Sequence, residues 1–95
     1  MKALAFSPAA ERDLERIWDY SAENWGPDQA ERYTEQIMDM CLALAAGTRR
    51  GRTADIRAGY LKQAVGSHMI YFRDDGGMLH IMRILHLKQD TERHL

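Results

Sequence analysis

Apolar side chains recur every three or four residues along two long stretches of the N-terminal half, which is the spacing of an amphipathic helix. The first stretch starts at Ser7-Pro8, where a serine suits the N-cap and a proline suits the first helical turn. Gly26-Pro27 separates it from a second stretch that stops at Gly47. Because almost no linker remains between them, the two helices are predicted to form an antiparallel hairpin. Their expected core stripes are Leu14, Ile17, Trp18, Ser21 and Trp25, and then Ala30, Tyr33, Ile37, Met40, Cys41 and Leu44.

Short apolar runs elsewhere predict strands, and turn residues separate them. The segment Thr48–Asp55 has no periodicity and is expected to be a loop, whereas Asp74-Asp75-Gly76-Gly77 is typical of a hairpin turn. The order predicts an α+β fold with an N-terminal strand, a two-helix antiparallel hairpin packed on a small antiparallel sheet, and a short C-terminal segment after Leu87. The expected strands are Lys2–Phe6, Arg57–Val65, Ser67–Asp74 and Met78–His86.

The last predicted strand is largely apolar on both of its faces. With strict alternation, one face carries Leu79, Ile81, Arg83 and Leu85, and the other carries Met78, His80, Met82, Ile84 and His86. One helical hairpin covers only one face of a sheet, so the second face is expected to need a partner chain over its apolar side chains. The alternative is that the segment after Leu87 folds back over that face.

The length of 95 residues indicates a single domain over 1–95. Hydrophobic residues make up 45% of the chain and charged residues 28%, and no apolar run reaches the length of a membrane-spanning helix. Cys41 is the only cysteine, so no internal disulfide can form, and we expect a cytoplasmic protein. Cys41 lies on an apolar stripe, which favours a buried small residue over a nucleophile.

Charge is divided unevenly along the chain. Residues 1–46 hold four basic and nine acidic side chains, a charge of -5, and residues 47–95 hold nine basic and five acidic side chains, a charge of +4. Proteins that hold nucleic acid by its phosphates usually carry a clear positive excess, and this chain has a net charge of -1. We therefore expect no direct sequence-specific nucleic-acid binding by this chain alone. No cofactor motif is present, and the histidines lack the spacing of a metal site.

Two groups of residues are candidates for function. Arg49, Arg50, Arg52 and Arg57 lie within nine positions, which indicates either a solvated loop or a docking site for phosphates or an acidic partner. His86 ends the last strand three residues after Arg83, and a cation beside an imidazole could assist phosphoryl transfer. The alternative for His86 is a local hydrogen bond at the strand end.

The order of short motifs resembles the ParE branch of the RelE/ParE toxin superfamily, the toxins of bacterial toxin–antitoxin pairs, over nearly the whole chain. The motifs are Leu4-x-Phe6-Ser7, Ala10-x-x-Asp13-Leu14, Ile17-Trp18-x-Tyr20, Trp25-Gly26, Arg57-x-Gly59-Tyr60, Gly66-Ser67-His68, Ile81-x-Arg83-Ile84-Leu85-His86, Asp90 and Arg93-His94-Leu95.

The resemblance implies a RelE/ParE-like fold and a cognate ParD-type antitoxin that forms a hetero-oligomer with the toxin. It also implies a toxin that poisons DNA gyrase by binding it, without bond chemistry and therefore without catalytic residues. Tyr60 and Arg83 can equally be structural, the first as a core residue and the second paired with an acid. Candidate contacts to the target or antitoxin are Arg49, Arg50, Arg52, Arg57, Tyr60, Arg83 and His86.

Two other functions remain open at this point. RelE-type relatives cut mRNA on the ribosome, and the corresponding groups here would be Arg83 and His86, with Arg73 as a second arginine. The stretch Leu87–Leu95 has no tyrosine and only one lysine, Lys88, which together with the near-neutral charge favours the gyrase hypothesis over this one. A third hypothesis is a toxin-like domain that has lost its toxicity and survives as an antitoxin-binding module.

Overall fold

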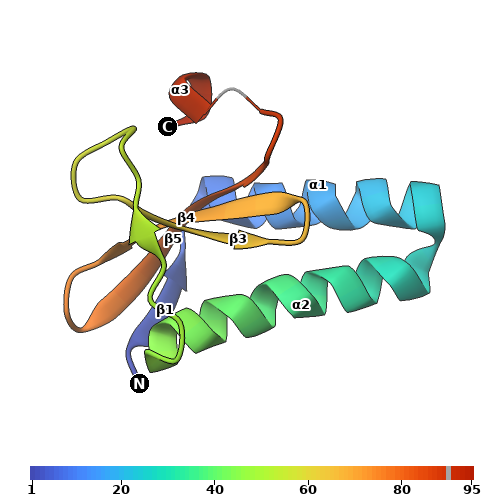
Figure 1. The fold of residues 1–95 in the computed structure, drawn as a ribbon. Helices are drawn as coiled ribbons and strands as arrows, with labels where there is room; N and C mark the ends of the chain where they lie inside the picture. Colours follow the sequence, from blue (N-terminus) through green and yellow to red (C-terminus); the bar gives the residue numbers. More distant parts are fainter. Residues whose placement is uncertain (90) are drawn as a thin grey trace.

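The two long helices begin and end at the residues that the sequence indicates. A computed structural model of the chain describes residues 1–89 and 91–95 and contains α1 (Pro8–Trp25) and α2 (Pro27–Ala46) as an antiparallel hairpin (Figure 1). The Ser7 hydroxyl accepts the Ala10 N–H at 3.0 Å, which caps α1. Gly47 adopts a left-handed conformation, φ 82°, which ends α2. No helix in the described ranges is both long and apolar enough to cross a membrane.

One expectation for the helices is wrong. The Trp25 side chain is 65% exposed rather than packed in the core, although it lies at stripe spacing. It is the last residue of α1 and extends past the sheet, so no strand lies beneath it (Figure 1). Trp18 is half-buried, and its indole N–H donates to the Glu31 carboxylate at 3.5 Å.

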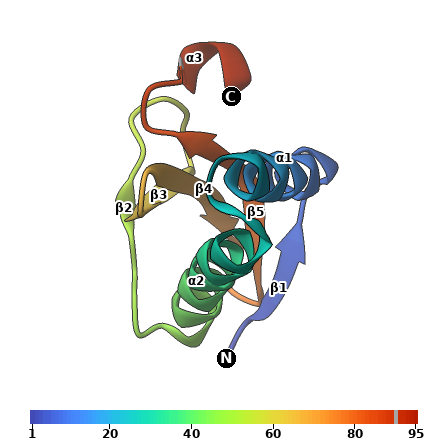
Figure 2. The same cartoon turned by 90° about the vertical axis from the view of Figure 1, so that its right-hand side faces the viewer.

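The strands form one five-stranded sheet in the order β1-β5-β4-β3-β2. Strand β1 pairs with β5 in parallel, and the other neighbours are antiparallel, so the sheet is mixed rather than wholly antiparallel. The helical hairpin follows β1 and carries the chain back across the sheet, which makes the parallel pairing sterically accessible (Figures 1 and 2). The strands are β1 (Ala3–Phe6), β2 (Arg52–Thr53), β3 (Leu61–Val65), β4 (His68–Asp74) and β5 (Met78–His86), and a short helix α3 (Thr91–His94) follows.

The segment before β3 differs from its prediction. The expected strand from Arg57 begins only at Leu61, and the expected loop contains the two-residue strand β2. The chain turns back on itself between these strands, because the Ala54 N–H donates to the Tyr60 carbonyl at 2.9 Å and the Tyr60 N–H donates to the Arg57 carbonyl at 3.2 Å. The apolar residues that suggested a strand from Arg57 onward therefore belong to a loop that packs against the sheet.

The main hydrophobic core lies between the helical hairpin and one face of the sheet. Both helices cover the same face, as the end-on view in Figure 2 shows. Burial of these side chains supplies most of the driving force for folding. The buried core residues are Ala10, Ile17, Ile37, Cys41, Leu44, Val65, Ile70, Phe72, Leu79, Ile81 and Ile84.

A β-bulge changes which side chains of β5 share a face. The register shifts between Tyr71 and Phe72, whose partners on β5 are Arg83 and Ile81, so Met82 is an extra residue in that strand. Ile81 and Ile84 consequently point toward the helices together, whereas Met82 and Leu85 belong to the other face. The strict alternation assumed from the sequence is therefore wrong beyond Ile81.

Part of the second face of the sheet is covered by the chain itself. Four buried residues form a small cluster there, and Met69, Met82 and Leu95 pack against them. The loop between β2 and β3 and the C-terminal residue cover these four side chains, whereas Met69 and Met82 stay half-exposed, so a partner chain on this face stays a prediction. The alternative, a fold-back of the C-terminal segment, is confirmed over this cluster, with the loop as a second contributor. The buried members are Ala54, Tyr60, Tyr71 and Leu85.

Candidate functional site

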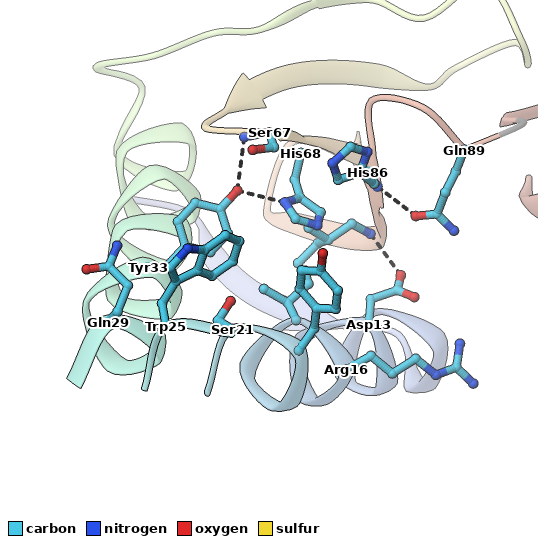
Figure 3. A pocket seen from close by; sticks show the side chains of 13 residues that line it. Asp13, Arg16, Ser21, Trp25, Gln29, Tyr33, Ser67, His68, His86 and Gln89 are labelled. Atoms are coloured by element: carbon cyan, nitrogen blue, oxygen red, sulfur yellow. Dashed lines mark hydrogen bonds between the residues drawn. The ribbon is translucent and has the colours of Figure 1, made fainter. Parts of the chain in front are cut away.

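A cleft of about 620 Å³ lies where α1, the start of α2, the β3–β4 turn and the ends of β4 and β5 meet (Figure 3). Apolar surface makes up most of its walls, and polar side chains from both the helices and the sheet line the rest. This composition is typical of binding sites, which are mostly apolar with a few placed polar groups. The lining residues are Asp13, Arg16, Ile17, Tyr20, Ser21, Trp25, Gln29, Tyr33, Ser67, His68, Ile84, His86 and Gln89.

Tyr33 of α2 anchors the β3–β4 turn. Its hydroxyl oxygen accepts the Ser67 N–H at 3.0 Å and lies 2.7 Å from Nδ1 of His68 (Figure 3). Gly66 in the turn has φ 55°, and a Cβ built there would lie 2.6 Å from the Tyr33 ring. The turn thus requires glycine both for its backbone conformation and for the approach of the tyrosine.

His68 is held as a neutral ring. The Tyr33 hydroxyl oxygen lies 2.7 Å from Nδ1 of His68 and 3.4 Å from the Val65 carbonyl oxygen, and we assign its proton to the shorter contact, which makes Nδ1 the acceptor. The pKa of His68 is lowered from 6.5 to about 4, mainly by burial and also by the neighbouring His86, against an opposing effect of Asp13. A neutral ring with Nδ1 as acceptor carries its proton on Nε2.

His86 lies directly opposite His68 across the β4–β5 ladder. The Leu87 N–H donates to the Ser67 carbonyl, so the adjacent pair is hydrogen-bonded and the two histidines form the closer, non-hydrogen-bonded pair. Their rings are 5.2 Å apart and edge to face. Nδ1 of His86 accepts the Lys88 N–H at 3.1 Å, and the alternative of local hydrogen bonding at the strand end is confirmed.

Arg83 is not among the residues that line the cleft, and it pairs with Asp13 of α1. The carboxylate accepts both Nε and Nη2 of Arg83, at 2.8 and 2.9 Å, and also the Ile84 N–H at 2.9 Å. These hydrogen bonds raise the pKa of Arg83. Strand β1 ends opposite Ile81, so the edge of β5 beyond Ile81 has no neighbouring strand within residues 1–89 and 91–95. The Asp13 carboxylate accepts the Ile84 N–H at this edge in place of a strand partner. The structural alternative for Arg83, pairing with an acid, is confirmed.

The remaining candidate residues are spread over other parts of the surface. Tyr60 is a buried member of the second-face cluster, as its structural alternative states, and the Arg57 guanidinium lies 5.8 Å from the centre of its ring. Arg49 and Arg50 line a separate cavity of about 300 Å³. Arg52 is exposed on β2, and Arg73 is exposed on β4 opposite His80. The structure thus places Arg57 beside Tyr60, but it does not bring all the residues predicted to contact a partner into one site.

Several cleft residues were not singled out from the sequence as functional. Tyr33 and Trp25 were assigned to core stripes, and His68 was noted only as a histidine without metal-site spacing. Tyr20 and Trp25 form an edge-to-face pair at 5.9 Å, and both are more than half exposed. One sequence feature could have indicated the cleft: Tyr20 and Trp25 are two aromatic residues close to the C-terminal end of α1, just before Gly26-Pro27.

Comparisons with known proteins place this geometry in context. Residues 4–91 match the family model described as the ParE toxin of the type II toxin–antitoxin system parDE. The chain is 43% identical to Toxin ParE1 of Mycobacterium tuberculosis over 91 residues. This alignment covers 94% of the present chain and 93% of the relative. It is 34% identical to Toxin ParE1 of Caulobacter vibrioides over 100% of this chain and 99% of the relative.

A solved structure shares the fold. The structure of the chromosomal ParDE toxin–antitoxin system from P. aeruginosa contains a chain that superimposes on this one with a TM-score of 0.81. The match covers 93% of this chain and 98% of that chain at 24% sequence identity. The expected RelE/ParE-like arrangement of two helices on a small sheet is thereby confirmed.

Proposed function

Because the chain belongs to the ParE toxin family of type II toxin–antitoxin systems, we propose that it inhibits bacterial growth by binding and poisoning DNA gyrase in the cytoplasm. A ParD-type antitoxin neutralises it in a hetero-oligomer. The observation that carries the proposal is the family match over residues 4–91, together with a relative at 43% identity over nearly the full length of both chains. The family description itself pairs the toxin with the parDE system.

The geometry favours a toxin that binds over one that cuts RNA. Of the three groups that the ribonuclease alternative requires, Arg83 is committed to Asp13, and Arg73 and His86 lie on opposite faces of the sheet. Arg73 and the His68 partner of His86 are five residues apart on β4, a separation of roughly 16 Å. A phosphate cannot contact these groups together, so we propose that the toxin is not an enzyme.

Unpaired arginines provide candidate contacts for the acidic residues of an antitoxin or target. In the described ranges Arg49, Arg50, Arg52 and Arg57 have no ion-pair partner, and the Arg57 guanidinium lies 5.8 Å from the centre of the Tyr60 ring. Arginine is suited to such contacts because its planar guanidinium binds carboxylates through two parallel hydrogen bonds. We propose that these four residues, with Tyr60 as the support of Arg57, contribute to partner binding. We also propose His86 as a contact, through the cleft.

A supercoiling assay tests the proposed target. Purified toxin is incubated with gyrase and relaxed plasmid, and we expect loss of supercoiling and accumulation of cleaved DNA, reversed when the co-expressed antitoxin is added. A translation assay with the same toxin preparation is the control, and it should proceed at its normal rate. Arrest of translation with normal supercoiling would replace the proposal by the ribosomal alternative. Normal growth on induction without antitoxin would favour the module that has lost toxicity.

A further inference from the structure

The floor of the cleft presents two hydrogen-bond donors that have no acceptor in the described part of the chain. Nδ1 of His86 accepts the Lys88 N–H, and Nδ1 of His68 is assigned as the acceptor of the Tyr33 hydroxyl, so a ring with a single proton carries that proton on Nε2 in both cases. The two rings are neighbours across the ladder and both line the cleft (Figure 3). A ligand in the cleft therefore meets N–H groups on two rings whose centres are 5.2 Å apart, and the two oxygens of a carboxylate are acceptors suited to two such donors.

The opposite side of the cleft is aromatic and exposed. Trp25 is 65% and Tyr20 60% exposed, and Ile17 and Tyr33 continue the apolar wall inward. Tryptophan and tyrosine are the residue types that contribute most at protein interfaces, because they bury a large rigid area at a low entropic cost. The volume of about 620 Å³ is enough for more than one side chain of a partner.

The charges around the cleft also select for an acidic group. Among the described residues, Asp13 is the only acidic one in the lining, and Arg83 and the Ile84 N–H already saturate it. Arg16 stands at the outer end with no ion-pair partner in the described ranges, and its guanidinium extends along α1 in Figure 3. A polyanion would meet the acidic helices of residues 1–46, whose charge is -5, whereas a single carboxylate would not be strongly repelled.

We propose that this cleft docks a segment of a partner protein that presents a carboxylate side chain next to a large apolar side chain. The carboxylate accepts the Nε2–H groups of His68 and His86, and the apolar side chain lies against Tyr20 and Trp25. The proposal concerns the recognition chemistry of the cleft and does not depend on gyrase being the target of the toxin.

Two capped tripeptides test the site directly with the full-length protein. Acetyl-Leu-Glu-Phe-amide and its neutral counterpart acetyl-Leu-Gln-Phe-amide are titrated into ¹⁵N-labelled protein, followed by NMR. The glutamate peptide should shift the Trp25 indole signal and the ring signals of His68 and His86. It should bind about tenfold more tightly than the glutamine peptide, because charged acceptors form the stronger hydrogen bonds.

Variants assign the preference to named groups. His86→Leu should reduce the ratio of the two affinities to near one, and His86→Gln, which restores an N–H donor, should recover part of it. Trp25→Ala should weaken both peptides and leave their ratio unchanged. Leu42→Ala is the matched control, since Leu42 is exposed on α2 and does not line the cleft. Circular dichroism spectra identify any variant that has lost its fold. If a variant is unfolded, the comparison of the two peptides with the wild-type protein still tests the proposal.

Three outcomes would overturn the proposal. Equal affinity of the wild-type protein for the glutamate and glutamine peptides would show that the histidine donors do not select a carboxylate. Shifts confined to residues outside the cleft would place peptide binding elsewhere. Tighter binding of a short single-stranded oligonucleotide than of the glutamate peptide, with shifts in the cleft, would make the cleft a nucleic-acid site.

Discussion

Asp13 with Arg83 and His68 with His86 are two polar pairs near the same half of β5, and they differ in how fully they are satisfied. Asp13 accepts three hydrogen bonds, and Arg83 also donates to the His94 carbonyl at 2.9 Å. Each histidine uses one ring nitrogen and leaves the other unpaired in the described ranges. The first pair joins α1 to the edge of the sheet, and the second lines an open cleft.

The difference separates the residues of the fold from the residues of recognition. A buried charge that has lost its partner is costly, so the first pair should respond to substitution mainly through stability. Partly exposed donors facing solvent contribute little to stability, so the cleft should respond mainly through partner binding. The following predictions test this separation.

Asp13→Asn should have the largest effect on stability. It removes the charge that compensates the partly buried Arg83 guanidinium, and a cost of about 3–5 kcal/mol in the free energy of unfolding is expected. Urea denaturation measures it. Asp19→Asn, an exposed acid on the same helix, is the matched control and should change stability by less than about 0.5 kcal/mol. A decrease of less than about 1 kcal/mol in the free energy of unfolding of Asp13→Asn would show that the Asp13–Arg83 pair does not stabilise the packing of α1 on β5.

Tyr33→Phe should have the second-largest effect. The substitution leaves the Ser67 N–H and Nδ1 of His68 without the hydroxyl, and we expect a loss of about 1–2 kcal/mol in the free energy of unfolding. Tyr20→Phe is the control, because the Tyr20 ring is exposed and its hydroxyl has no hydrogen-bond partner in the described ranges. Equal stability of the two variants would contradict the anchoring role of Tyr33.

Stability should also depend on the protonation of His68. Its folded-state pKa of about 4 lies below the value of 6.5 expected in the unfolded chain, so the unfolded chain binds the proton first. Stability should therefore be constant above pH 6.5 and fall between pH 6.5 and 4, by about 1–2 kcal/mol after allowance for solvent screening of a half-exposed ring. The groups facing this ring are Tyr33, His86 and Asp13.

The control for this pH dependence is His68→Gln. Denaturation curves of the variant and the wild type are compared at each pH, and the difference between them should shrink from pH 6.5 to pH 4. A difference that stays constant over this range would show that His68 does not titrate between the two values. The exposed Asp74 and Asp75 have pKa values lowered by their hydrogen bonds, so their contribution is lost only at more acidic pH.

Trp25→Ala should have the smallest effect on stability and a large effect on function. The lost edge-to-face contact with Tyr20 contributes about 0.5–1 kcal/mol at this exposed position. Growth inhibition after induction should nevertheless decrease strongly, whereas Leu42→Ala should inhibit growth like the wild type. A stable Trp25→Ala variant with full toxicity would show that the cleft is not needed for growth inhibition.

The helices could be predicted from the sequence because several local signals agree. Periodicity, the Ser7 cap and the glycines at 26 and 47 all indicate the same boundaries, and the structure confirms them. The bulge at Met82 could not be predicted, since nothing in the sequence marks one residue of a strand as extra. That single insertion accounts for the mistaken assignment of faces along the second half of β5.

The cleft was harder to predict than the fold because its parts are far apart in the chain. Tyr33 and His68 are 35 residues apart, and Asp13 and Arg83 are 70 residues apart, so neither contact has a local signature. Asp13 does lie at helical spacing between Ala10 and Ile17, on the buried side of α1. A carboxylate at such a position indicates a buried partner, and pairing with an acid is the structural alternative that the sequence leaves open for Arg83.

The state of the two histidine rings tests the central claim most directly. Long-range ¹H–¹⁵N correlation spectra at pH 8 distinguish the two neutral forms of each imidazole ring. The account predicts that both His68 and His86 carry the proton on Nε2, with Nδ1 unprotonated, and that Tyr33→Phe removes this preference at His68 alone. A proton on Nδ1 of either ring in the wild-type protein would contradict it, because the cleft would then lack its pair of donors.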